Sequence, residues 1–185
     1  FGDNSMKKIF CFLLIFIISS ILYSQKVNVS IDEFTDKKII YTTWETLSIN
    51  VASGEWYYRF YSQGGLNVLE IRFMTSNMDV RMVEAGTSMN IKFDDDSKGN
   101  LYSVETQISS IGGGSVGMRG AQSLGIWLRY SNLENDLDIF ENKLITLIRI
   151  NYKNNKGNFY DDLKISGKNA KKFQASYKLL GDCPL

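Results

Sequence analysis

An acidic segment at 94–99 has the spacing of a calcium-binding loop. With Asp94 at the first position of such a loop, Asp96 stands at the third and Glu105 at the twelfth. Two features oppose this interpretation: Lys98 occupies a ligand position, and both flanks alternate as strands rather than as helices. We therefore predict a plain hairpin turn, with a calcium site at Asp94, Asp96 and Glu105 as the alternative and no other cofactor.

Histidine is absent from the 185 residues of this chain. Imidazole titrates near neutral pH and is the commonest metal ligand, so Ser-His-Asp catalysis, Cys-His catalysis and histidine-ligated zinc or haem are excluded here. The absence of histidine also excludes the G-x-S-x-G pattern at 113–117 as a nucleophile elbow, because such an elbow needs a histidine base. We predict no catalytic residue in the chain.

The glycine-rich segment 112–125 also contains G-x-G-x-x-G at 112–117. A dinucleotide site needs this motif to open a helix, whereas a strand-like run follows it here. We predict a connection whose glycines adopt positive φ. The alternative is a ligand or partner loop that uses backbone N–H groups and Arg119.

The aromatic residues between 56 and 61 divide between the two faces of a predicted strand, because successive side chains on a strand alternate. The even-numbered members are predicted to fill the core. Tyr57, Arg59 and Tyr61 then share the other face. Exposed aromatic residues beside arginine are typical of contact surfaces, and sugars also stack on such rings, so we predict these three as binding residues. A second packed layer on this face is the alternative.

Two alternating runs flank the dipeptide Gly64-Gly65, which predicts a tight hairpin. With these glycines at the centre of the turn, apolar residues face apolar residues across the strand pair and Arg59 faces Glu70. A shift of one residue would break this match.

The remaining pattern predicts an α+β fold that is mainly antiparallel β: one twisted or partly closed sheet with two short helices. An all-β sandwich or barrel with a C-terminal helix is the alternative. A capping-box pattern at Ser131 and Glu134 predicts the first helix, which extends to Phe140, and an amphipathic pattern from Ala170 ending at Gly181 predicts the second. Further strands are expected near 27–31, 38–44, 46–51, 87–93, 101–111, 124–130, 144–152 and 159–165.

The N-terminal segment has the features of a secretory signal peptide. Lys7 and Lys8 precede an apolar run from Ile9 to Tyr23, whose 15 residues fall short of the roughly 20 needed to span a bilayer. We predict a vector scar or misassigned start at 1–5, a signal peptide at 6–24 and a single exported domain at 25–185. An uncleaved N-terminal anchor is the alternative.

The formal charge of the chain is nearly balanced, with 21 basic and 20 acidic residues. This argues against a nucleic-acid partner, which requires a basic excess. The segment 143–178 nevertheless contains nine basic residues and two acidic ones. A solvated helix face accounts for most of these lysines, and peripheral membrane contact through the C-terminal basic helix is the alternative.

Four segments carry a resemblance: 31–35 together with Trp44, 120–126, 148–152 and 169–173. In these segments the chain resembles small exported bacterial proteins that carry a signal peptide and have no assigned function. The resemblance implies export to the periplasm or the exterior and a single domain. It transfers no catalytic residue.

Taken together, these patterns favour a non-enzymatic exported bacterial domain, expected to be monomeric. It would bind a protein, glycan or surface partner through a sheet edge, the glycine-rich loop or exposed aromatic residues. A periplasmic hydrolase or small-ligand-binding protein built on carboxylates in a curved sheet is the alternative.

Overall fold

The computed structural model describes residues 26–50, 54–76, 79–132 and 137–181. The expected start segment and signal peptide at 1–24 lie outside the described residues. Within the described ranges, none of the helices has the length and apolar character needed to cross a membrane.

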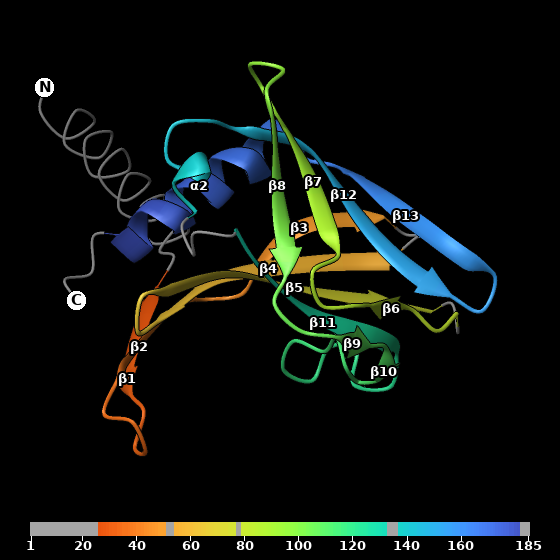
Figure 1. The fold of residues 1–185 in the computed structure, drawn as a ribbon, viewed down its shortest axis with the longest axis horizontal. Coiled ribbons are helices and arrows are strands. Elements are labelled where there is room, and N and C mark those ends of the chain that lie inside the picture. The colour runs from red at the N-terminus through yellow and green to blue at the C-terminus, as the bar shows by residue number, and fades with distance from the viewer. Residues whose placement is uncertain (1–25, 51–53, 77–78, 133–136, 182–185) are drawn as a thin grey trace, which may run out of the picture.

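The described residues form one mainly antiparallel sheet and one α-helix (Figure 1). The elements, in chain order, are β1 (Val27–Ile31), β2 (Lys38–Thr42), β3 (Glu45–Asn50), β4 (Gly54–Gln63), β5 (Leu66–Thr75), β6 (Met82–Val83), β7 (Ser88–Phe93), β8 (Lys98–Ser103), β9 (Gln107–Ile108), β10 (Ser110–Ile111), β11 (Leu124–Ser131), the 3-10 turn η1 (Asp138–Phe140), β12 (Ile145–Asn154), β13 (Gly157–Lys164) and α2 (Gly167–Gly181).

The thirteen strands belong to a single open sheet, in the order β1-β2-β4-β5-β11-β8-β7-β12-β6-β9. In addition, β3 pairs with β4, β10 with β11 and β13 with β12. Since every pairing is antiparallel, the prediction of a mainly antiparallel sheet is confirmed. The described strands form neither a two-sheet sandwich nor a closed sheet.

The predicted helix beginning at Ser131 is wrong. Ser131 is the last residue of β11 and pairs with Tyr102 of β8, and its hydroxyl donates a hydrogen bond to the Asn67 carbonyl oxygen at 2.7 Å. Of the rest of that segment, Asp138–Phe140 form only a 3-10 turn, and Glu134 lies outside the described residues. Sheet pairing has overridden the local capping pattern, since the serine that would cap the helix is used by the sheet.

The hairpin of β4 and β5 has the predicted register. Gly64 and Gly65 form the turn with φ values of 59° and 85°, which glycine adopts without strain. Arg59 lies opposite Glu70 as expected. The predicted register is therefore confirmed for both strands, and this register fixes which of their side chains point away from the core.

Helix α2, the predicted C-terminal helix, packs on the core face of the sheet near β2, β3 and β4 (Figure 1). The Phe173 ring lies 4.7 Å from Tyr58 and 4.9 Å from Phe60, measured between ring centroids. The Tyr58 and Ser176 hydroxyls share a hydrogen bond of 3.1 Å inside this packing. The even-numbered side chains of β4 thus fill the core, which leaves the odd-numbered ones on the opposite face.

Candidate functional site

The face of β4, β5 and β11 that points away from α2 carries arginine and aromatic side chains in rows, and we call it the aromatic face. One row crosses the three strands from Arg59 through Glu70 to Arg129. The neighbouring row consists of Tyr57, Arg72 and Trp127. Because directly opposed residues on adjacent strands lie side by side, each row brings its side chains into contact.

In the first row, one buried carboxylate serves two arginines. The Glu70 side chain is 2 % exposed. Its Oε2 lies 2.5 Å from Arg59 Nε, and its Oε1 lies 3.3 Å from Arg129 Nε. Arg129 also lies 3.7 Å from the carboxylate of Glu105. The ion pairs hold both guanidinium groups in fixed positions on the face.

In the second row, Arg72 contacts two tryptophan rings that meet edge to face. Its guanidinium carbon is 4.4 Å from the centroid of Trp44, in the link between β2 and β3, and 4.5 Å from that of Trp127. Arg59 joins the same stack, 4.7 Å from the Trp44 ring and 5.0 Å from the Tyr41 ring. These are cation–π contacts, and because the Trp44 and Trp127 rings are inclined at 75° to each other, the Arg72 guanidinium cannot lie flat on both.

Arg72 has no carboxylate within ion-pair distance among the described residues. Burial, followed by repulsion from Arg59, lowers the pKa of Arg72 below its ordinary value. Its Nη1 donates a hydrogen bond to the Ser115 carbonyl oxygen, while its Nε is buried and has no hydrogen-bond partner in the described ranges. The positive charge of the second row is therefore not balanced within that row.

The Ser115 carbonyl reaches Arg72 because the glycine-rich loop packs closely against β5. A Cβ atom at Gly114 or at Gly125 would overlap the Phe73 carbonyl group. The predicted positive φ is also present in this loop, for example 74° at Gly112. The loop is thus both a connection, as predicted, and a cover over part of the aromatic face.

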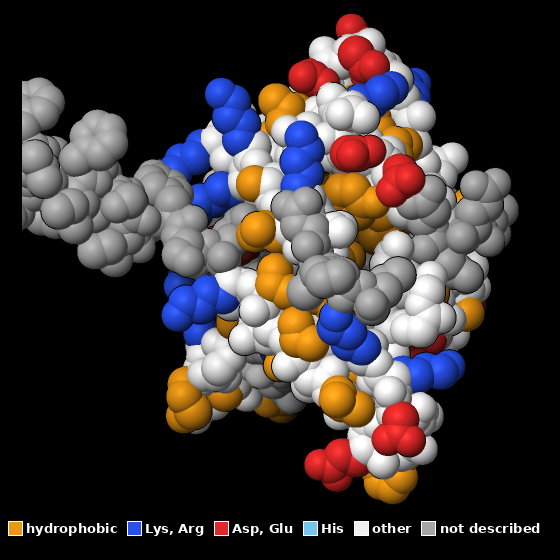
Figure 2. Space-filling model, turned by 90° about the vertical axis from the view of Figure 1, so that its left-hand side faces the viewer, with side chains coloured by type: hydrophobic (Ala, Val, Ile, Leu, Met, Phe, Trp, Pro, Cys, Tyr) orange, Lys and Arg blue, Asp and Glu red, His pale blue; other side chains and the backbone are white. Residues whose placement is uncertain are grey.

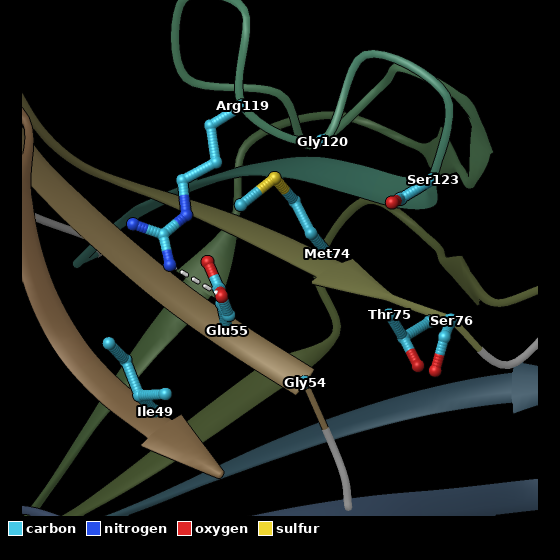
Figure 3. A pocket seen from close by; sticks show the side chains of 9 residues that line it. All are labelled: Ile49, Gly54, Glu55, Met74, Thr75, Ser76, Arg119, Gly120 and Ser123. Carbon is cyan, nitrogen blue, oxygen red and sulfur yellow. Dashed lines mark hydrogen bonds and ion pairs between the residues drawn. The ribbon is translucent and has the colours of Figure 1, made fainter. Parts of the chain in front are cut away.

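Arg119 leaves this loop toward β4 (Figure 3). Its Nη2 lies 2.6 Å from Glu55 Oε1, and its guanidinium carbon lies 5.8 Å from the Tyr57 ring centroid. The hydrogen bond from Arg119 lowers the pKa of Glu55. A cavity of about 310 Å³ adjoins the pair, lined also by Met74 and Ser123 (Figure 3). Arg119 is therefore held at the border of the aromatic face.

The two predicted tyrosines also lie on this face. The Tyr57 hydroxyl donates to Glu55 Oε2 at 2.7 Å, and burial, followed by this hydrogen bond, raises the pKa of Tyr57 to about 12. Tyr61 lies under Arg129, whose guanidinium carbon is 5.3 Å from its ring centroid, and burial raises the pKa of Tyr61. The four predicted binding residues thus lie on this face or at its border, but Tyr57 is only 6 % exposed, so the expectation of an exposed aromatic side chain is wrong at that position.

The predicted calcium ligands are not brought together. Asp94 and Asp96 lie in the turn between β7 and β8, where acidic side chains gather at the top of the molecule in Figure 2. Asp94 Oδ1 accepts a hydrogen bond from the Leu144 backbone N–H at 3.2 Å, and Asp96 lies 2.6 Å from Lys92 Nζ.

Glu105 lies beyond the other end of β8 and contacts Arg129 instead. An extended strand advances about 3.3 Å per residue, so the intervening strand holds Glu105 away from the turn. In the part of the chain that the structure describes, no group of three or more carboxylates or thiols could hold a metal ion.

Sequence reasoning did not single out Trp44, Trp127, Arg72 or Arg129 as site residues. Arg72 could have been predicted, because the same alternation that places Arg59 on the outer side of β4 places Arg72 on the outer side of β5. Trp127 and Arg129 alternate with apolar residues along β11, but the sequence does not show that β11 pairs with β5.

Comparisons with protein-family models, with curated proteins and with solved structures find no match to this chain. A functional argument therefore rests on the chemistry of the site.

Proposed function

We propose that this protein is a non-enzymatic exported bacterial binding domain and that the aromatic face is its contact surface. The observation that carries the proposal is the stacking of Arg59 and Arg72 on Trp44 and Trp127, with Trp127 36 % exposed. Tryptophan and arginine held rigidly on a sheet are the residue types that dominate binding energy at contact surfaces.

The chemistry of the face favours a partner rich in hydrogen-bond acceptors. Arg59, Arg72 and Arg129 present N–H donors, whereas Glu70, which lies between two of them, is buried and already engaged. Stacking on rings pre-organises the guanidinium groups, so little side-chain entropy is lost when a ligand binds. Acidic glycans fit this surface best, because their carboxylates pair with arginine while their sugar rings stack on tryptophan. An acidic protein surface is the second source of the same chemistry.

The alternative, a hydrolase or small-ligand-binding protein based on carboxylates, would need two carboxylates across a cavity. Of three cavities formed by described residues, two are lined by one carboxylate each, Glu55 and Glu84, and the third is lined by none. Both of those carboxylates are paired with a cation: Glu55 with Arg119, and Glu84 with Lys153 at 2.7 Å. Among the contacts of the described residues that line these three cavities, none favours this alternative.

The proposal keeps the expected export through the signal peptide, the monomeric state and the absence of a nucleic-acid partner. It assigns the contact surface to the sheet rather than to α2, so peripheral membrane contact through the basic helix would be secondary. On α2 itself Lys172 lies 3.5 Å from Glu45, which engages one of its lysines within the fold.

The test is affinity electrophoresis of the purified protein in gels that contain a polyuronate, with neutral dextran as the comparison polymer. The polyuronate should retard the wild type, and Trp127→Ala should abolish the retardation. Phe159→Ala is the matched control, because Phe159 is exposed to 39 % but lies on β13, outside the aromatic face. This control should migrate like the wild type.

A second arm covers a protein partner: wild type, Trp127→Ala and Phe159→Ala are each used to capture proteins from a bacterial envelope extract. Capture by the wild type and Phe159→Ala but not by Trp127→Ala would support the proposal. Equal retardation and equal capture by all three proteins, or no binding in either arm, would reject the aromatic face as the contact surface.

A further inference from the structure

A second cationic surface lies on the strands at the other end of the sheet. Four residues form a row across β8, β7, β12 and β13: Lys98 lies opposite Lys92, Lys92 opposite Leu147, and Leu147 opposite Lys164. Their chain neighbours, such as Ile91 and Ile148, are buried in the core. Alternation therefore places the row on the face that points away from the core, and we call it the lysine row.

The lysine row contains a pairing that strands normally avoid. Like charges directly opposite each other on an antiparallel pair are destabilising, and Lys92 and Lys98 have this relationship. Lys92 is partly compensated by Asp96, whose carboxylate is 2.6 Å away. Lys98 and Lys164 have no carboxylate within ion-pair distance in the described ranges. An arrangement that costs stability with no structural gain is typical of a functional site.

Beside the lysines, three asparagines form a directed chain of hydrogen bonds. Asn151 Nδ2 donates to Asn90 Oδ1 at 3.1 Å, and Asn90 Nδ2 donates to Asn100 Oδ1 at 2.8 Å. The chain is anchored at its start, because Asn151 Nδ2 also donates to the Ser88 carbonyl oxygen at 2.8 Å. Its polarity makes the Asn100 NH₂ group the last member, and a donor rather than an acceptor is left for a ligand.

One cavity of about 450 Å³ lies here, lined by Lys92, Lys98, Asn90, Asn100, Ile91, Leu147 and Arg149. No carboxylate is among the residues that line it. Arg149 is oriented by two bonds of 2.7 Å to Asp162 on β13. The cavity therefore offers ammonium, guanidinium and amide donors together with two apolar residues, Ile91 and Leu147.

We propose that this cavity binds an oxyanion, a phosphate or sulfate group, carried by a small ligand. The anion would lie between the Lys92 and Lys98 ammonium groups and accept a hydrogen bond from the Asn100 amide. It would remove the repulsion between the two lysines, and charge-assisted hydrogen bonds to an anion are among the stronger ones in proteins. The site shares no residue with the aromatic face, so neither proposal depends on the other.

The test measures binding of three probes to the full chain by titration calorimetry and sedimentation. The probes are inorganic phosphate, glucose 6-phosphate, and phosphatidylglycerol vesicles compared with phosphatidylcholine vesicles. The variant is Lys92→Gln/Lys98→Gln. Its control is Lys171→Gln/Lys178→Gln, which removes the same charge from exposed positions on α2.

At least one phosphate-bearing probe should bind the wild type and the control with similar affinity, and the Lys92→Gln/Lys98→Gln variant should bind it about tenfold or more weakly, as expected for lost bonds to charged groups. Binding of the free phosphates without the vesicles identifies a soluble ligand, and binding of the anionic vesicles identifies a lipid headgroup; either supports the site. A near-ultraviolet circular dichroism spectrum identical to that of the wild type establishes that the variant is folded.

Two results would overturn the proposal. The first is that no probe binds the wild type. The second is an equal loss of affinity in the α2 control, which would show that total charge, rather than this cavity, determines binding.

Discussion

The aromatic face and the lysine row both lie on the outer side of the sheet, but they differ in how their positive charges are balanced. On the aromatic face, arginines are stacked on rings and two of them share the buried carboxylate of Glu70. In the lysine row, the Lys92 and Lys98 ammonium groups oppose each other. The short ion pair of this row joins Lys92 to Asp96, which lies in the exposed turn between β7 and β8. Guanidinium is planar and weakly hydrated, so it packs against rings, whereas ammonium needs water or an anion around it.

The comparison indicates how each surface would bind. The aromatic face is rigid before any ligand arrives, because its charges are fixed by stacking and by ion pairs. The repulsion between the lysines of the lysine row is relieved only when a ligand supplies negative charge. Removal of a charged side chain should therefore lower the free energy of unfolding when it is made on the aromatic face and raise it when it is made in the lysine row.

The largest effect is expected at Glu70. Glu70→Ala leaves Arg59 and Arg129 without their shared, buried partner, and breaking such a pair typically costs about 3–5 kcal/mol in the free energy of unfolding. Urea denaturation followed by tryptophan fluorescence measures the loss. The matched control is Glu84→Ala, which removes the exposed pair with Lys153 and should cost at most about 1 kcal/mol. Similar losses in both variants would contradict a rigid, charge-dependent aromatic face.

The next effect concerns alkaline pH. The pKa of Tyr57 is 10.0 in an ordinary setting and is raised to about 12 in the fold. The folded state therefore retains the phenolic proton more strongly than the unfolded state does. This contribution is fully present below pH 10 and is lost as pH rises through 12, by an amount of up to roughly 2 kcal/mol for a shift of this size.

Denaturant titrations between pH 9 and about 12 measure this decline. In Tyr57→Phe the free energy of unfolding should fall less steeply over that range, because no proton is lost at this position. Parallel curves for the variant and the wild type would show that Tyr57 is not held in a buried, Glu55-bonded setting.

A smaller effect separates the two cation types. Arg72→Lys keeps the charge but loses the delocalised guanidinium that contacts both Trp44 and Trp127, and it should cost about 1 kcal/mol in the free energy of unfolding. The reverse exchange in the lysine row, Lys92→Arg, should change stability by less than about 0.5 kcal/mol, as surface substitutions usually do. If both exchanges had the same effect, stacking would not distinguish the surfaces.

Sequence reasoning predicted part of this arrangement, because some of it depends only on alternation within a hairpin. The turn at Gly64 and Gly65 fixes the register of β4 on β5, and Tyr57, Arg59 and Tyr61 follow from it. The position of Trp127 on the aromatic face depends on which strand lies beside β5, and that strand, β11, is distant in the sequence. Trp44 was expected at the end of a strand over 38–44, but β2 ends at Thr42 and Trp44 lies in the short link to β3, where strand alternation does not place its side chain.

The same limit explains the wrong helix and the unpredicted lysine row. At Ser131 the local capping pattern was sound, but pairing with β8 determined the structure. Lys92, Lys98 and Lys164 are unremarkable along the chain and form a row only once four strands are in register. Local features such as a hairpin turn and its register can thus be predicted from the sequence, whereas the order of strands in the sheet cannot.

The smallest expected effect has the opposite sign, and it is the sharpest test of the comparison. Lys98→Gln removes one of two directly opposed like charges while an amide of similar length remains, so in the absence of oxyanions the variant should be more stable by about 0.2–1 kcal/mol. Thermal unfolding at low ionic strength measures the gain, which should shrink in high salt as screening weakens the repulsion. Lys178→Gln on α2, which has Gln174, Ala175 and Gly181 as its helical neighbours, removes a charge with no lysine one turn away and should show no comparable gain. A loss of stability in Lys98→Gln would mean that this ammonium is already satisfied by the fold, and the lysine row would then resemble the aromatic face in balancing its own charge.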